Sequence, residues 1–192
     1  MAPGLITAST RILQIKIELG EVRPHVWRRV LVPDAMTLNG LHDVIQQAMG
    51  WTDSHLHEFE IDAQRFAPPD EDNDEEVLDS TTATLGLVAG QNSDLSYLYD
   101  FGDGWSHTLI VEAVLAPEPG GRYPRCLAGA RPCPPEDVGG PHGYGEFLAA
   151  LRDPDHPGHE ELTAWAEGFD PGSFDLAIAD KRLEELAWIN SA

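Results

Sequence analysis

Two histidines, His55 and His57, stand two positions apart in a segment where apolar and polar residues alternate. Side chains two apart on a strand share one face, and apolar residues continue this face, so both imidazoles should face the core. His107 lies on the apolar face of a later predicted strand, and Asp100 and Asp103 lie in the turn before it. Imidazole and carboxylate ligands suit zinc or manganese, and a metal-bound water would be a nucleophile. The metal ligands predicted from this pattern are His55, His57, His107 and Asp103. The alternative is that the histidines at the strand end hydrogen-bond ordinary backbone groups.

A second group of possible ligands lies in a segment rich in proline and glycine. Cys133, Glu136, Asp137 and His142 fall within ten residues of one another. Cys126 and Cys133 are separated by six residues, which is too wide for a zinc knuckle, and no second cysteine pair exists. We expect a rigid loop that covers the sheet. The alternative is that this loop supplies metal ligands.

No complete catalytic motif is present. The chain has no Gly-x-Ser-x-Gly elbow, no P-loop and no helical His-Glu-x-x-His pair. Glu58, next to His57, is a candidate acid or base. The first hypothesis is therefore a non-enzymatic accessory or interaction domain that binds a small ligand or a protein partner. The residues assigned to its surface are Trp51, Glu58, Asp100, Trp105, Cys133, Glu136, Asp137, His142 and Tyr144.

The elements that must position these residues follow from hydrophobic periodicity. Strands are predicted at 11–19, 26–32, 55–61, 95–100 and 105–115, and helices at 37–49, 82–88, 144–151, 157–166 and 174–187. Residues 116–143 are predicted to be irregular. The fold class is α+β: an antiparallel or mixed sheet with helices packed on one face, and a C-terminal half that is mostly helical. A flexible tail at 1–10 and a single domain at 11–190 are expected.

The charge balance of the chain is strongly acidic. Its 192 residues include 12 Lys and Arg against 33 Asp and Glu, a formal net charge of −21. Direct nucleic-acid binding is not expected, because phosphate contacts need Lys and Arg. Six acids among residues 70–76 lack the spacing of an EF-hand and predict a solvated loop. Without a signal-like leader or an 18-residue apolar run, and with two cysteines, a cytoplasmic protein with no membrane segment is expected.

Several short motifs occur in a recognisable order. They are Gln14–Ile17, Trp27–Arg29, Val32-Pro33, Leu41-His42, Ile45-Gln46, Met49–Trp51, His55–Phe59, Tyr99–Asp103, Trp105, His107, Cys133–Gly140, Phe169–Pro171 and Phe174-Asp175. Over about residues 11–186 the chain resembles the Ri-plasmid Orf-three-like family, whose members include insertion-element passenger proteins labelled TnpR-type resolvases. The resemblance implies a compact α+β domain and assigns no catalytic residue.

Two alternative functions remain beside the interaction domain. A metal-binding protein or metal-dependent hydrolase would use the histidine cluster described above. A DNA resolvase is disfavoured, since a serine resolvase needs an arginine cluster around its nucleophile and a basic helix-turn-helix. Here Ser9 has only Arg11 close by in the sequence, and the chain would repel DNA.

Overall fold

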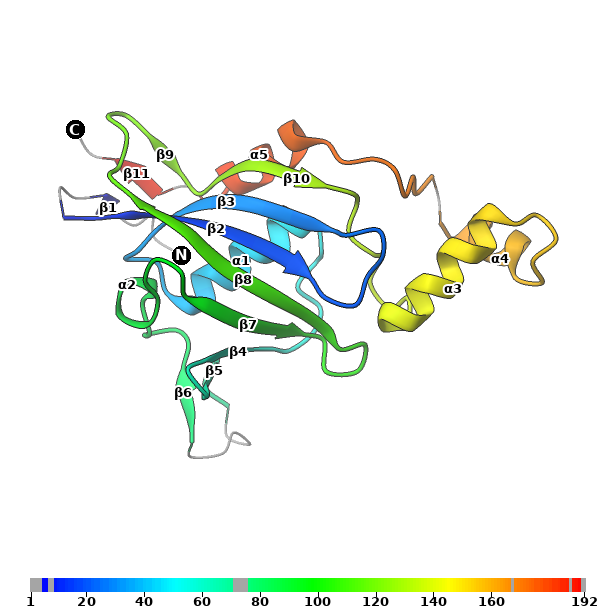
Figure 1. Ribbon diagram of the computed structural model, residues 1–192, viewed down its shortest axis with the longest axis horizontal. Helices are drawn as coiled ribbons and strands as arrows, with labels where there is room; N and C mark the ends of the chain where they lie inside the picture. The colour runs from blue at the N-terminus through cyan, green and yellow to red at the C-terminus, as the bar shows by residue number, and fades with distance from the viewer. Residues whose placement is uncertain (1–4, 7–8, 71–75, 167, 187, 191–192) are drawn as a thin grey trace.

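An eight-stranded sheet frames the computed structural model, which describes residues 5–6, 9–70, 76–166, 168–186 and 188–190 (Figure 1). Its strand order is β10-β3-β2-β8-β7-β4-β5-β6, and neighbouring strands are antiparallel except β5 and β6. These strands are β2 (Ile12–Leu19), β3 (Trp27–Pro33), β4 (His57–Ile61), β5 (Gln64–Ala67), β6 (Val77–Asp79), β7 (Asp94–Tyr99), β8 (Trp105–Leu115) and β10 (Arg125–Ala130). A small second sheet joins β1 (Leu5–Ile6), β11 (Trp188–Asn190) and β9 (Arg122–Tyr123).

Helix α1 (Leu38–Met49) is the central helix beneath the large sheet. It begins at Thr37, whose side-chain oxygen accepts a hydrogen bond from the backbone N–H of Gly40. It ends at Gly50, which has a φ of 97° in the left-handed region that favours glycine. One stripe of the helix is fully buried against the strands and comprises Leu38, Leu41, Val44, Ile45, Ala48 and Met49.

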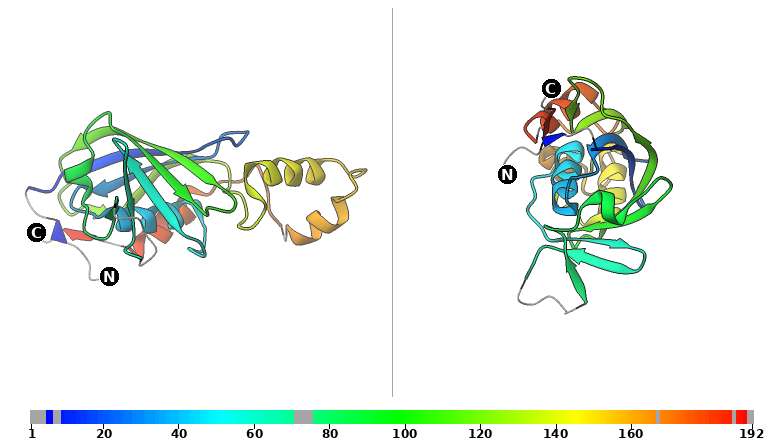
Figure 2. Two further views of the ribbon diagram at one scale, coloured as in Figure 1. Left: turned by 90° about the horizontal axis from the view of Figure 1, so that it is seen from below. Right: turned by 90° about the vertical axis from the view of Figure 1, so that its left-hand side faces the viewer.

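The other helices occupy two places. Helix α5 (Leu176–Glu184) lies beside α1, so that both cover the same face of the sheet (Figure 2). Helices α3 (Gly140–Arg152) and α4 (His159–Trp165) pack on each other beyond the end of the strands (Figure 1). Helix α2 (Leu85–Val88) is a single turn. None of the described helices has the length and apolar character that crossing a membrane requires.

The α+β class is confirmed, but the prediction of a mostly helical C-terminal half is wrong. The second half of the chain contributes β8, β9, β10 and β11 as well as α3, α4 and α5. The segment predicted to be irregular contains β10, which pairs with β3 as an edge strand. Its Ala and Gly residues have low strand propensity, so only pairing with a preformed neighbour makes them extended.

Two segments were expected to lack regular structure, the tail at 1–10 and the acidic run at 70–76. Within the expected tail, Leu5–Ile6 form β1 and pair in parallel with β11. The acidic run at 70–76, expected to be a solvated loop, lies outside the described residues from 71 to 75.

Candidate functional site

Three loops meet at one end of the large sheet. They are the 51–56 segment that follows α1, the β7–β8 turn at residues 100–104, and the 132–140 loop that precedes α3. Trp51 donates a hydrogen bond from its indole nitrogen to the carbonyl oxygen of Pro134, at 3.0 Å. Contacts of this kind bring together motif residues that lie far apart in the sequence.

Glu136 is the main acceptor between these loops. Its Oε1 accepts a hydrogen bond from the Tyr99 hydroxyl at 2.6 Å, and its Oε2 accepts from the backbone N–H and the hydroxyl of Thr52. The Tyr99 oxygen in turn accepts from the backbone N–H of Ser54 at 3.0 Å. Burial and the bond to Glu136 raise the pKa of Tyr99, so the phenol stays a neutral donor. Glu136 therefore ties the 132–140 loop to both neighbouring loops.

Asp103 holds the other end of the 132–140 loop against the β7–β8 turn. Its Oδ2 accepts a hydrogen bond from the backbone N–H of Gly139 at 3.1 Å. Gly140 has a φ of 69°, and a Cβ at this position would lie 2.3 Å from the carbonyl oxygen of Asp103. The close approach of the two loops therefore requires glycine here.

A histidine and two aspartates come together where the three loops meet. Nε2 of His55 lies 3.2 Å from Oδ1 of Asp137 and 3.6 Å from Oδ2 of Asp100. One ligand atom from each of the three residues lies within 4.8 Å of the others, and this is the one such group of three among the described residues. The structure thus brings His55 and Asp100 together with Asp137, which the sequence had placed in a separate cluster.

The other two predicted histidine ligands lie in the aromatic core. His57 stacks on His42, with ring centroids 3.5 Å apart and planes 8° apart. His107 hydrogen-bonds through Nδ1 to the carbonyl oxygen of Trp105 at 3.0 Å. Burial lowers the pKa of His57 to about 3, with the neighbouring His42 adding to the shift, and burial lowers the pKa of His107 to about 4. Both rings are therefore neutral near pH 7, and neither belongs to the His55 group in the described structure.

The remaining predicted surface residues are dispersed. Trp105 is buried and packs against Trp51, with ring centroids 6.0 Å apart. Glu58 points away from His57 and pairs with Arg65, at 2.6 Å. His142 is exposed in the first turn of α3, whereas Tyr144, two residues further along the helix, is buried and stacks on Phe147. Cys133 lines a cavity, described next.

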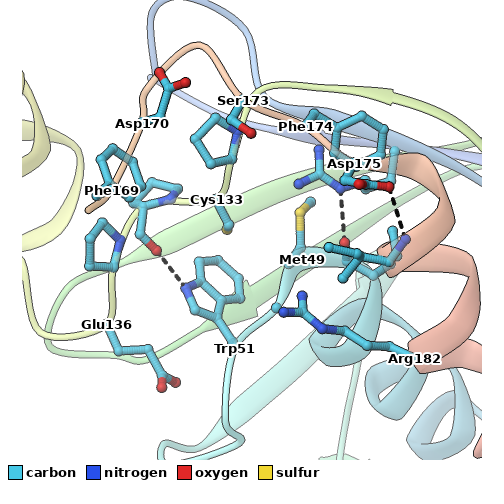
Figure 3. A pocket seen from close by; sticks show the side chains of 18 of the residues that line it. Met49, Trp51, Cys133, Glu136, Phe169, Asp170, Ser173, Phe174, Asp175 and Arg182 are labelled. Carbon is cyan, nitrogen blue, oxygen red and sulfur yellow. Dashed lines mark hydrogen bonds between the residues drawn. The ribbon is translucent and has the colours of Figure 1, made fainter. Parts of the chain in front are cut away.

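A cavity of about 570 Å³ opens beside the 132–140 loop (Figure 3). Its walls come from β3, the ends of α1 and α4, the 132–140 loop, α5 and the 168–175 segment that leads into α5. Trp51, Phe169 and Phe174 supply aromatic surface, and Cys133 lies between them. A volume of this size suits a small organic molecule.

Two arginines line this cavity. Arg28 is 2% exposed, and its Nε and Nη1 groups donate to the carbonyl oxygens of Ala48, Trp27 and Ala130. Its guanidinium lies 4.2 Å from the ring centre of Phe174. Burial lowers the pKa of Arg28, and nearby Arg182 acts in the same direction, but a guanidinium stays charged at neutral pH.

Arg182 extends from α5 to the end of α1. A Cβ at Gly50 would lie 2.5 Å from Nη1 of Arg182, so the guanidinium rests against the C-terminus of α1, where the helix dipole favours a cation. Among the described residues, no carboxylate forms an ion pair with Arg28 or Arg182.

Two carboxylates of the cavity wall already accept hydrogen bonds, and the thiol of the wall is not ionised. Asp175 caps α5 by accepting from the backbone N–H groups of Ala177 and Ile178, and Asp170 accepts from that of Gly172. Burial raises the pKa of the Cys133 thiol, so it is protonated at neutral pH. Both cysteines are free thiols.

Arg28 and Arg182 were missing from the residues predicted to form a site. A signal for Arg28 was present, because it shares one strand face with Val30 and Val32, which are fully buried. A cation at a core-facing strand position requires a partner or a function. Arg182 gave no such signal, since basic residues near the end of a helix are ordinary.

The fold and the site define an α+β domain with an eight-stranded sheet and a cavity lined by loops and helices beside it. Residues 11–178 match the family described as plasmid pRiA4b ORF-3-like protein, and the chain belongs to this family. It is 40% identical over 188 residues to the uncharacterized protein y4hQ of Sinorhizobium fredii, covering 94% of this chain and 96% of that protein. The crystal structure of MM3350, a protein of unknown function from Methanosarcina mazei Go1, is similar with a TM-score of 0.82 and 33% identity. That match covers 88% of this chain and 97% of the other. The suspected family is therefore confirmed.

Proposed function

We propose that this protein is a small-molecule-binding domain whose cavity accepts an organic anion, a carboxylate or a phosphate. The observation that supports the proposal is the pair of arginines on the cavity wall with no ion-pair partner in the described structure. Planar guanidinium groups bind both kinds of anion through paired N–H donors.

Arg28 has one guanidinium nitrogen left for a ligand. A charged group removed from water is stabilised by pairing or by hydrogen bonds. Backbone carbonyls satisfy Nε and Nη1, while Nη2 has no partner among the described residues. An anion in the cavity would supply that partner.

Most arginines elsewhere in the chain pair with a carboxylate. Arg11, Arg29, Arg65, Arg122 and Arg125 do so, whereas Arg23, Arg131 and Arg152 form no ion pair among the described residues. In a chain with 33 acidic residues, partners are abundant. Arg28 differs from the other unpaired arginines because it is buried, and this burial beside the cavity favours a role in binding.

The cavity walls indicate what accompanies the anionic group. Trp51, Phe169 and Phe174 provide apolar surface, which favours a ligand with an aromatic or aliphatic body. Glu136 and Asp170 lie on the side of the cavity opposite Arg182 (Figure 3). The acid group is therefore expected near Arg28 and Arg182, where the Asp175 carboxylate is occupied by hydrogen bonds from the N-terminus of α5.

Binding without turnover is part of the proposal. A thiol acts as a nucleophile through its thiolate, and the raised pKa of Cys133 disfavours that form. A small ligand in a cytoplasmic compartment is proposed as the partner, in place of nucleic acid or a membrane.

The test compares anionic probes with a neutral probe of the same shape. Calorimetric titrations of the full chain would use benzoate, phenyl phosphate and benzyl alcohol. We expect saturable binding of at least one anion and at least tenfold weaker binding of the alcohol. Inorganic phosphate tests whether the anionic group alone suffices.

A matched pair of variants locates the binding. Arg182→Gln and Lys181→Gln remove one positive charge each from neighbouring exposed positions on α5. We expect Arg182→Gln to weaken binding of the anion at least tenfold and Lys181→Gln to change its affinity less than twofold. Equal effects of the two variants, or equal binding of the alcohol, would refute the proposal.

A further inference from the structure

We propose that His55, Asp100 and Asp137 form a binding site for one divalent transition ion, zinc or manganese. This inference is independent of the anion site. The ligands are Nε2 of His55, Oδ2 of Asp100 and Oδ1 of Asp137, which come from three different loops. One imidazole and two carboxylates are ligands that both ions accept.

The distances between the ligand atoms suit a common ion. At metal–ligand distances of about 2.0–2.2 Å, neighbouring ligand atoms of a tetrahedral or octahedral site lie roughly 3–3.5 Å apart. Nε2 of His55 lies 3.2 Å and 3.6 Å from the two carboxylate oxygens. All three ligand atoms lie within 4.8 Å of one another, so binding would require the two carboxylates to move closer together.

The hydrogen bonding of His55 gives an independent indication. Its Nε2 atom is covered by protein, yet it forms no hydrogen bond with either nearby oxygen. An imidazolium would direct its N–H at one carboxylate. The nitrogen instead lies close to both oxygens and aligned with neither, as ligand atoms do around a shared centre.

Asp100 gives the second indication. Its side chain is 10% exposed, and its Oδ1 accepts hydrogen bonds from the backbone N–H groups of Gly102 and Asp103. Its Oδ2 has no hydrogen-bond partner in the described part of the chain and faces His55. This oxygen is therefore available to a cation that His55 also binds.

The surrounding structure holds these ligands in place. The turn hydrogen bonds fix Asp100, and the bond from Gly139 to Asp103 holds the loop that contains Asp137. The Asp137 side chain is 76% exposed, which leaves one side of the site open to water. Such a site would bind its ion with water molecules completing the coordination.

The experiment measures metal binding directly on untagged full-length protein after treatment with a chelator. Mn²⁺ is titrated by electron paramagnetic resonance and Zn²⁺ by calorimetry. We expect one equivalent of at least one ion with a micromolar or lower dissociation constant. Less than a tenth of an equivalent of both ions, with no shift in melting temperature, would overturn the proposal.

Variants distinguish this site from other acidic groups of the chain. His55→Ala and Asp137→Asn should each weaken binding at least tenfold. Their matched controls are His142→Ala and Asp155→Asn, which change exposed residues of the same types outside the site. Retained binding in His55→Ala or Asp137→Asn would place the ion elsewhere and refute the assignment. Because Asp137 is mostly exposed, Asp137→Asn should fold, and circular dichroism checks this.

Discussion

Replacing His57 with glutamine should make the stability of the protein less sensitive to acid. His57 is 7% exposed and its ring stacks on His42, so its protonated form is poorly solvated. Burial lowers its pKa to about 3, whereas an unfolded histidine titrates at about 6.5. As pH falls below 6.5, the unfolded chain gains a proton that the folded chain does not. Stability is therefore lost as pH falls from 6.5 toward 3.

The size of this loss follows from linkage. One proton bound only by the unfolded state changes the free energy of unfolding by about 1.4 kcal/mol per pH unit. Between pH 7 and pH 5 the contribution of His57 is then about 2 kcal/mol. The acidic groups of the chain also titrate in this range, but they are the same in wild type and variant. Their contribution cancels in the difference.

Urea unfolding at pH 5, 6 and 7 measures the effect. The free energy of unfolding of the wild type should fall by about 2 kcal/mol more than that of His57→Gln over this range. His142→Gln, at an exposed position, should follow the wild type. Parallel profiles for the wild type and His57→Gln would show that the folded protein does not hold this imidazole neutral, and the argument for a buried framework histidine would fail.

Other perturbations test the loops, the cavity and the charge. Gly140→Ala places a Cβ 2.3 Å from the Asp103 carbonyl oxygen at a positive φ, so urea unfolding should show a loss of at least about 1–3 kcal/mol. Arg28→Met leaves three backbone carbonyls, including that of Ala48, without their donor, and should destabilise the protein by about 1–3 kcal/mol in the same assay. Cys133 should react with iodoacetamide much more slowly at pH 7 than a free thiol does, because burial raises its pKa; mass spectrometry of the labelled peptide checks this. Duplex DNA should show no retardation by micromolar protein at low salt, since the net charge is −21.

Periodicity predicted the interior of the sheet because local pattern and tertiary environment agree there. In β2 and β8 apolar residues alternate with polar ones, and the apolar face is buried in both strands. In β10 the local pattern and the tertiary environment disagree, since the segment Arg125–Ala130 contains Ala and Gly and follows a proline. Only the open edge of β3 makes that segment a strand. The sequence pattern of one segment does not show whether another strand has a free edge with which it can pair.

The site was predicted in part for the same reason. Alternation correctly placed His57 and His107 on the buried face, but a buried face holds packed rings as readily as ligands. Which loops meet depends on contacts such as those of Glu136 with Thr52 and Tyr99, which link residues 37 to 84 positions apart. No sequence periodicity encodes these contacts. For this reason the prediction placed Asp137 and His55 in two different clusters.

The 132–140 loop connects the two proposals physically. Glu136 lines the cavity, and its neighbour Asp137 is a proposed metal ligand. Adjacent Cα atoms lie about 3.8 Å apart, so a shift of the loop at one residue moves the other. Glu136 accepts hydrogen bonds from three donors and Gly139 donates one to Asp103, which restricts the loop at its middle and near its C-terminal end. These hydrogen bonds hold in place a loop that forms no helix or strand before α3. They fix the positions of its side chains, which face the cavity on one side and His55 on the other.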